Sequence, residues 1–147
     1  MYKNLLVPTD GSALSGRTIR DAAKMAAKLG ARITGLYVAP TYHIEVYIDF
    51  VPPDIITPEQ HKASAKKAAQ RHLEVIRKAA TQNRVKYSGD YVLSDNAADA
   101  IVKAARKHKC DLIYMGSHGR SGLTKLLLGS QTSKVLAQTR IPVLVHR

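Results

Sequence analysis

The chain has a single cysteine, Cys110, among its 147 residues. One cysteine excludes an internal disulfide framework and a cysteine-based metal cluster. No apolar run approaches the roughly 20 residues that a membrane-spanning helix needs. The short apolar run near the start meets Pro8 and Asp10 at once, which does not fit the core of a signal peptide. The length and the 45% apolar content suit one domain with a hydrophobic core, spanning 1–147. We therefore expect a cytoplasmic protein.

Acidic residues are also scarce, with 11 Asp and Glu against 23 Lys and Arg, and the formal net charge is +12. Such an excess is compatible with nucleic acid, a membrane surface or an anionic ligand as partner. The densest basic run, His61 to Lys78, places its cations opposite Ala and Leu positions of one helical pattern, which indicates a solvated outer face. Aromatic residues are few, and none interleave with this run as single-strand nucleic-acid binders require. We expect no membrane partner, and a nucleic-acid partner is the weakest alternative.

Short apolar runs alternate with segments of helical periodicity along the chain. The runs predict five strands, at Lys3–Pro8, Arg32–Val38, Lys86–Leu93, Leu112–Gly116 and Ile141–His146. Polar residues that favour helix N-termini precede each of four intervening helices. The expected caps are Ser12, Thr57 with Gln60 completing a capping box, either Ser94 or Asp95, and Ser130.

This alternation predicts an α/β fold in which an open parallel sheet is covered by helices on both faces, with right-handed crossovers. Ligands of such sheets lie beyond the carboxyl ends of the strands, where strand order reverses. The first and fourth strands are the natural neighbours there, and their ends carry Pro8 to Asp10 and Met115 with Gly116. The segment Ala39–Ile56 follows neither period, so we expect a long loop.

The segment from Asp111 to Ser130 runs from an apolar strand through a glycine-containing loop to a helix start. Glycines allow backbone N–H groups to approach an anion, and the first turn of a helix supplies unpaired N–H groups. The chain has neither the Gly-Lys-Ser/Thr of a Walker loop nor G-x-G-x-x-G. Its spacing is G-x2-G-x9-G-S, formed by Gly116, Gly119, Gly129 and Ser130. The alternative is that these glycines only shape the loop between the strand and the helix and bind no phosphate.

This spacing matches the nucleotide-binding signature G-x2-G-x9-G-[ST] of the universal stress protein family, and the chain resembles the ATP-binding branch of that family. The opening NLLVPTDGS, the segment LLLGSQTSKV and the ending IPVLV are also similar to the family, so the resemblance covers nearly the whole chain. It implies a Rossmann-like sheet with strand order 3-2-1-4-5. It also implies bound ATP or a related adenine nucleotide, with Mg²⁺ as a common companion of the phosphates.

The resemblance also implies a role for individual residues. Asp10 and the backbone of Pro8 and Thr9 would meet the adenine and ribose, and the backbone of Val38 would contact the adenine edge. Met115 and Gly116 would lie beside the ribose. The expected phosphate group is Gly119, Arg120, Gly129, Ser130, Gln131 and Thr132, with His118 as a further phosphate contact or acid. The alternatives are a helix-start role for Asp10, ordinary first-turn polarity for Gln131 and Thr132, and an exposed loop position for His118.

The leading hypothesis is an ATP-binding stress-response or signalling protein. A nucleotide-independent dimeric interaction module and a basic nucleic-acid-binding protein are the alternatives. The sequence has no nucleophile elbow and no strong candidate for a catalytic base, so we expect at most a slow ATPase or self-phosphorylation. The histidines show no spacing for a metal site.

The last predicted strand is apolar and ends the chain, which places an apolar strand at a sheet edge that must be covered or paired. The family resemblance implies that two copies pair this strand antiparallel across a two-fold axis. We therefore expect a homodimer through the C-terminal strand.

Overall fold

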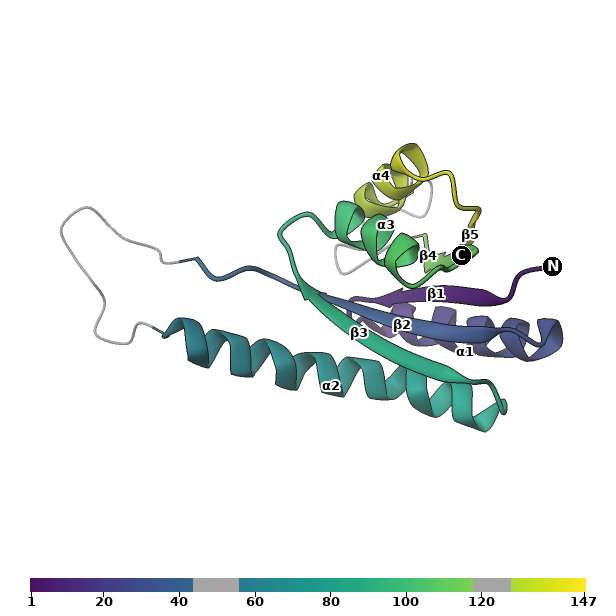
Figure 1. Ribbon diagram of the computed structural model, residues 1–147, viewed down its shortest axis with the longest axis horizontal. Helices are drawn as coiled ribbons and strands as arrows, with labels where there is room; N and C mark the ends of the chain where they lie inside the picture. The colour runs from purple at the N-terminus through teal and green to yellow at the C-terminus, as the bar shows by residue number, and fades with distance from the viewer. Residues whose placement is uncertain (44–55, 118–127) are drawn as a thin grey trace.

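The computed structural model describes residues 1–43, 56–117 and 128–147. Within these ranges, strands and helices alternate along the chain (Figure 1). Their bounds are β1 Asn4–Thr9, α1 Ala13–Leu29, β2 Arg32–Ala39, α2 Pro58–Gln82, β3 Tyr87–Leu93, α3 Ala97–Lys107, β4 Leu112–Gly116, α4 Ser130–Gln138 and β5 Val143–His146. Most of the expected loop Ala39–Ile56 lies outside the described residues.

The strands form one parallel sheet in the order β3-β2-β1-β4-β5. This confirms the α/β class and the strand order that the family resemblance implied. The chain moves outward from β1 to β2 and β3, then crosses to β4 and β5 on the other side of β1. The reversal at β1 places the carboxyl ends of β1 and β4 where ligands of such sheets bind.

Helices α1 and α2 cover one face of the sheet, and α3 and α4 cover the other (Figure 1). Successive residues of β1 alternate between these two layers. Leu5 and Val7 pack with α1 and α2, whereas Leu6 packs with α3 and α4. A central strand buried on both faces favours apolar residues at successive positions, which is why Leu5, Leu6 and Val7 form a continuous apolar run in β1.

Local sequence signals produced the expected ends of the first two helices. Ser12 caps α1 by accepting a hydrogen bond from the Ser15 N–H at 3.2 Å. Gly30 ends α1 in the left-handed region at φ 63°. Thr57 and Gln60 form the reciprocal capping box of α2. These expectations are confirmed because each depends only on residues a few positions apart.

The expected caps of the last two helices were wrong. Asn96 caps α3, because its side chain accepts from the Asp99 N–H, while Ser94 and Asp95 bond to other groups. Gly129 is the N-cap of α4, and Ser130 is its first helical residue.

Several strand boundaries also differ by one or two residues from the sequence-based expectation. β1 continues through Pro8 to Thr9, and β5 begins at Val143 rather than Ile141. Before β5, the Ile141 N–H donates to the Thr139 hydroxyl and Pro142 has no N–H, so pairing with β4 becomes regular only at Val143. Of the helices in the described ranges, none combines the length and the apolar character that a membrane crossing requires.

Candidate functional site

A cavity of about 350 Å³ opens at the carboxyl ends of β1 and β4. Every expected nucleotide-site residue within the described ranges lines it: Pro8, Thr9, Asp10, Val38, Met115, Gly116, Gly129, Ser130, Gln131 and Thr132. We call this space the carboxyl-end cavity. The other expected residues, His118, Gly119 and Arg120, lie outside the described residues. Segments from four parts of the chain therefore meet at one place.

The cavity forms where β1 and β4 stop pairing. Their register covers Leu5 with Leu112 and Leu6 with Ile113, whereas β1 and β2 remain paired as far as Thr9 and Tyr37. Pro8 has no N–H and cannot donate to a neighbouring strand. The carboxyl halves of β1 and β4 thus leave space between them for a ligand.

The turn after β1 is held by short-range hydrogen bonds. The Asp10 carboxylate accepts from the Ser12 N–H at 2.9 Å, and the Thr9 hydroxyl accepts from the Gly11 N–H at 3.1 Å. The hydroxyls of Thr9 and Ser15 lie 2.8 Å apart. Asp10 serves the helix start, as the alternative interpretation held, and also lines the cavity half-buried.

The N-terminus of α4 differs from those of the other helices. Side chains cap α1, α2 and α3. The N-cap residue of α4 is Gly129, and no side chain among the described residues caps this helix. The N–H groups of the first helical turn have no partner within the helix, and they carry partial positive charge. Gly129 through Thr132 line the cavity, so this positive end borders it.

The side chains of Thr132 and Gln131 hold α4 against its neighbours. Thr132, 3% exposed, donates its hydroxyl hydrogen to the Gly116 carbonyl at 3.0 Å. The Gln131 side-chain oxygen accepts from the Ala98 N–H in the first turn of α3 at 3.1 Å. In this arrangement the groups that α4 offers to an anion are backbone N–H groups rather than these two side chains.

Three further residues line the cavity that the sequence-based interpretation missed: Ser15, Ala97 and Ile101. Ala97 and Ile101 are one turn apart at the start of α3, and Ile101 is almost fully buried. With Val38 and Met115 they supply an apolar wall. No local signal marks them, because only the packing of α3 over the sheet brings them to this end.

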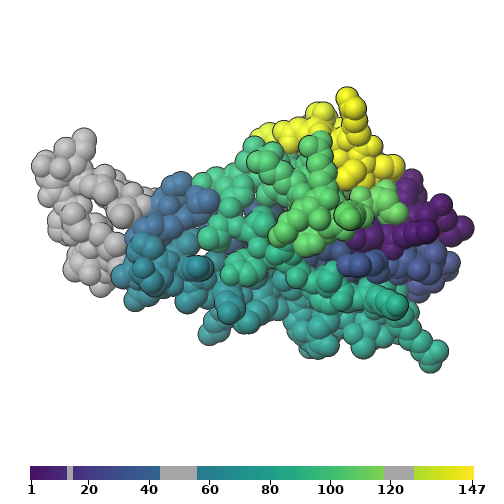
Figure 2. All heavy atoms as spheres, viewed as in Figure 1, coloured from purple at the N-terminus to yellow at the C-terminus, as the bar shows by residue number. Residues whose placement is uncertain are grey.

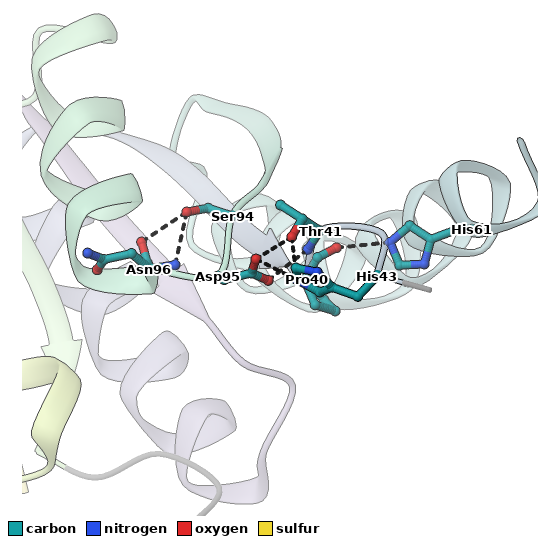
Figure 3. A network of polar contacts seen from close by, with 7 residues as sticks. All are labelled: Pro40, Thr41, His43, His61, Ser94, Asp95 and Asn96. Carbon is teal, nitrogen blue, oxygen red and sulfur yellow. Dashed lines mark hydrogen bonds and ion pairs between the residues drawn. The ribbon is translucent and has the colours of Figure 1, made fainter. Parts of the chain in front are cut away.

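A network of polar contacts fixes the chain beyond β2 beside the start of α3 (Figure 3). Asp95 accepts from the Thr41 N–H at 3.0 Å, and its Oδ2 lies 2.7 Å from His43 Nε2. The hydroxyl of Thr41 also donates to Asp95, and His61 Nε2 lies 2.9 Å from the Pro40 carbonyl. The hydrogen bonds from Thr41, and then that from His43, hold the pKa of Asp95 below its usual range. The network connects two elements that each contribute to the cavity wall, through Val38 and Ala97.

The chain matches the sequence model of the Universal stress protein family over residues 1–147. It is 32% identical over 150 residues to universal stress protein MJ0531 of Methanocaldococcus jannaschii, covering 99% of this chain and 82% of that protein. Its structure resembles that of protein MJ0577 of the same organism, with a TM-score of 0.80, 28% identity, and coverage of 99% of this chain and 95% of that one. A universal stress protein solved in complex with cAMP shares the fold, with a TM-score of 0.72 and 24% identity over 99% of this chain and 97% of that one. A protein of the same family from Burkholderia pseudomallei has a TM-score of 0.75 and 23% identity over 99% of this chain and 96% of that one. The chain belongs to the universal stress protein family.

Proposed function

We propose that this protein binds ATP or a close adenine nucleotide in the carboxyl-end cavity and acts in the stress response through the occupancy of that site. The N-terminus of α4, for which the described residues provide no side-chain cap, borders the cavity and carries the proposal. Unpaired N–H groups at the positive end of a helix are a favourable environment for phosphate. Gly116 and Gly129 of the glycine signature both line this cavity.

The other walls suit an adenosine. Val38, Ile101 and Met115 offer apolar surface for a flat base. The Asp10 carboxylate can accept a hydrogen bond from a ribose hydroxyl. The cAMP complex of another family member is in line with an adenine ligand, although at 24% identity that likeness concerns the fold alone. The proposal therefore rests on the donors, the carboxylate and the apolar wall of this chain.

A divalent cation is compatible with this donor set. Mg²⁺ commonly binds through one or two carboxylates together with phosphate oxygens. Among the described lining residues, Asp10 is the carboxylate that could take part. Asp10 is also the only titratable side chain among the described lining residues. Efficient phosphoryl transfer needs a positioned base or a group that orients water. We therefore propose that any ATP hydrolysis or self-phosphorylation is slow.

Calorimetry with ATP and Mg²⁺ tests the proposal, using Gly129→Val beside the parent. Gly129 has φ −58° and ψ 149°, an extended conformation that a valine adopts without strain. The added side chain should therefore fill space at the cavity and weaken ATP binding by about tenfold or more, while folding is retained. Ser133→Val, at an exposed position of the same helix, is the matched control and should bind as the parent does.

Two results would overturn nucleotide binding. One is the absence of both heat and thermal shift at millimolar ATP, combined with the absence of nucleotide in the denatured protein. The other is unchanged affinity in Gly129→Val. The protein would then fit a nucleotide-independent interaction module better.

We also propose that the protein forms a homodimer through β5. Within the described residues, β5 pairs only with β4, which leaves its other edge without a strand. Val143, Leu144 and Val145 on this strand are only partly buried. An apolar edge of this kind is stabilised when a second copy pairs with it.

A further inference from the structure

A second cavity, of about 450 Å³, lies at the opposite end of the sheet. Its walls come from the amino ends of β1, β2 and β3 and from the turns that end α1 and α2, at the right-hand end of Figure 1. Four cationic residues line it: Lys3, Arg32, Arg84 and Lys86. We call it the basic cavity. The length of β1 separates it from the carboxyl-end cavity, a distance of about 20 Å at the usual rise per strand residue.

We propose that the basic cavity binds a small, multiply charged phosphate compound, at a site separate from the proposed nucleotide site. The first argument is the charge balance. Within the described residues, no ion pair involves the side chains of these four cations. The Asp111 carboxylate, just before β4, accepts from the backbone N–H groups of Lys3 and Asn4, at 2.8 and 2.9 Å.

The ends of α1 and α2 account for only part of this positive charge. A helix C-terminus carries roughly half a negative charge, so two helix ends offset about one of the four cations. Like charges that share a cavity repel one another, and a bound polyanion would relieve that repulsion. The Asp111 carboxylate beside Lys3 offsets a further charge, so about two of the four positive charges remain for an anionic ligand to neutralise.

Arg84 lines the cavity in a left-handed backbone conformation, which Lys109 after α3 shares at φ 53°. Arg84 adopts this region at φ 56° just after α2, as Gly30 does at φ 63° at the end of α1. Glycine takes that conformation without strain, whereas a residue with a β-carbon does not. Arg84 and Gly30 both line the basic cavity. The turn after α2 therefore keeps a cation where glycine would be more favourable for the backbone.

The wall chemistry favours a compact phosphate compound over a nucleic acid. Guanidinium groups such as those of Arg32 and Arg84 bind phosphate oxygens in pairs, and lysines add point charges. The four cationic residues are exposed and line one hollow, and the described lining residues include no aromatic side chain on which a base could stack. A short phosphate chain or a metabolite with several phosphates matches this surface.

Calorimetry with inorganic tripolyphosphate at constant ionic strength tests the site. The double variant Arg84→Gly with Lys86→Gln should bind about tenfold or more weakly than the parent. The control, Lys62→Gln with Lys66→Gln, removes the same charge from exposed positions of α2 and should change affinity less than about twofold. Arg84→Gly alone should melt no lower than the parent, because glycine relieves the left-handed turn.

Gly129→Val tells the two cavities apart. If tripolyphosphate binds in the basic cavity, this variant binds it as the parent does, whatever happens to ATP. Loss of tripolyphosphate binding in Gly129→Val would place the anion in the carboxyl-end cavity and overturn the inference. Equal weakening in both double variants would indicate general charge attraction, and the absence of saturable binding to the parent would also refute the site.

Discussion

The imidazole of His72 lies directly against the backbone of Gly11. A β-carbon added to Gly11 would be 2.2 Å from Cε1 and 2.4 Å from Nδ1 of that ring. Gly11 belongs to the turn that carries Asp10 into the carboxyl-end cavity, and His72 belongs to α2. The ring of His72 also packs on Tyr37 of β2, with 4.8 Å between ring centroids. A helix that follows β2 in the chain thus shapes the turn that follows β1.

Replacing Gly11 with alanine should destabilise the protein. The residue has φ +77°, which costs an L-residue about 1 to 2 kcal/mol, and the overlap with His72 adds about 1 to 3 kcal/mol if the ring must move. The free energy of unfolding in denaturant measures the loss. Because the turn also positions Asp10, affinity for ATP should fall in the same variant.

The matched control is Gly16→Ala within α1. There a β-carbon would meet nothing closer than the Arg20 side chain at 3.8 Å, and φ is not positive. Alanine should stabilise this helical position by about 0.5 to 1 kcal/mol. Equal effects of the two substitutions would contradict the role assigned to the contact between Gly11 and His72.

Thr132→Val should weaken both folding and nucleotide binding. The substitution keeps the shape of the side chain but removes the hydrogen bond to the Gly116 carbonyl at a buried position. A hydrogen bond of this kind contributes about 0.5 to 1.5 kcal/mol, and without it α4 would no longer be tied to the end of β4. Thr132→Ser keeps the hydroxyl and should retain more of the ATP affinity, as calorimetry would report. If valine and serine behave alike in both assays, the hydrogen bond does not position α4.

Charges on β5 should separate the proposed dimer. Val143→Lys combined with Val145→Lys places repelling cations at the proposed interface, so sedimentation should show a dimer for the parent and a monomer for the variant. Circular dichroism would establish that the variant remains folded. Val75→Lys, at an exposed apolar position of α2, should leave the dimer intact. A parent that sediments as a monomer at tens of micromolar would refute pairing through β5.

The acid side of the stability profile should depend on Asp90. Its Oδ2 lies 2.8 Å from Lys107 Nζ and 2.7 Å from His108 Nε2. Burial alone would raise the pKa of Asp90, but the hydrogen bonds from Lys107 and His108 outweigh it and hold the pKa below its usual value. The unfolded chain then binds the proton more tightly, so this contribution is present above about pH 4 and is lost as the pH falls through the folded-state pKa.

Asp90→Asn should therefore lower the melting temperature at pH 7, and the difference from the parent should shrink below about pH 4. Thermal unfolding at several pH values measures both quantities. A difference that stays constant from pH 7 to acid would mean that the carboxylate charge is not its source.

The sequence by itself determined the features that depend on neighbouring residues. The alternation of apolar runs and helical periods predicted the α/β class, and the ends of α1 and α2 followed from Ser12, Gly30 and the pair Thr57 and Gln60. The strand order came from the family resemblance rather than from the pattern. The expected residues of the carboxyl-end cavity, where described, gather because parallel strands bring their carboxyl ends to one edge.

The tertiary structure decided what depends on contacts between distant segments. Asp95 does not cap α3, because Thr41 and His43 bind its carboxylate, and Asn96 takes that place. The Gln131 side chain accepts a hydrogen bond from α3, so the backbone N–H groups of α4 and the Ser130 hydroxyl are left to meet an anion. The basic cavity likewise joins strand and helix ends far apart in the chain, which form one surface in the space-filling view (Figure 2). Local periodicity carries no information about which long-range partners a side chain binds or about where a helix packs over the sheet. Both depend on the packing of the whole domain.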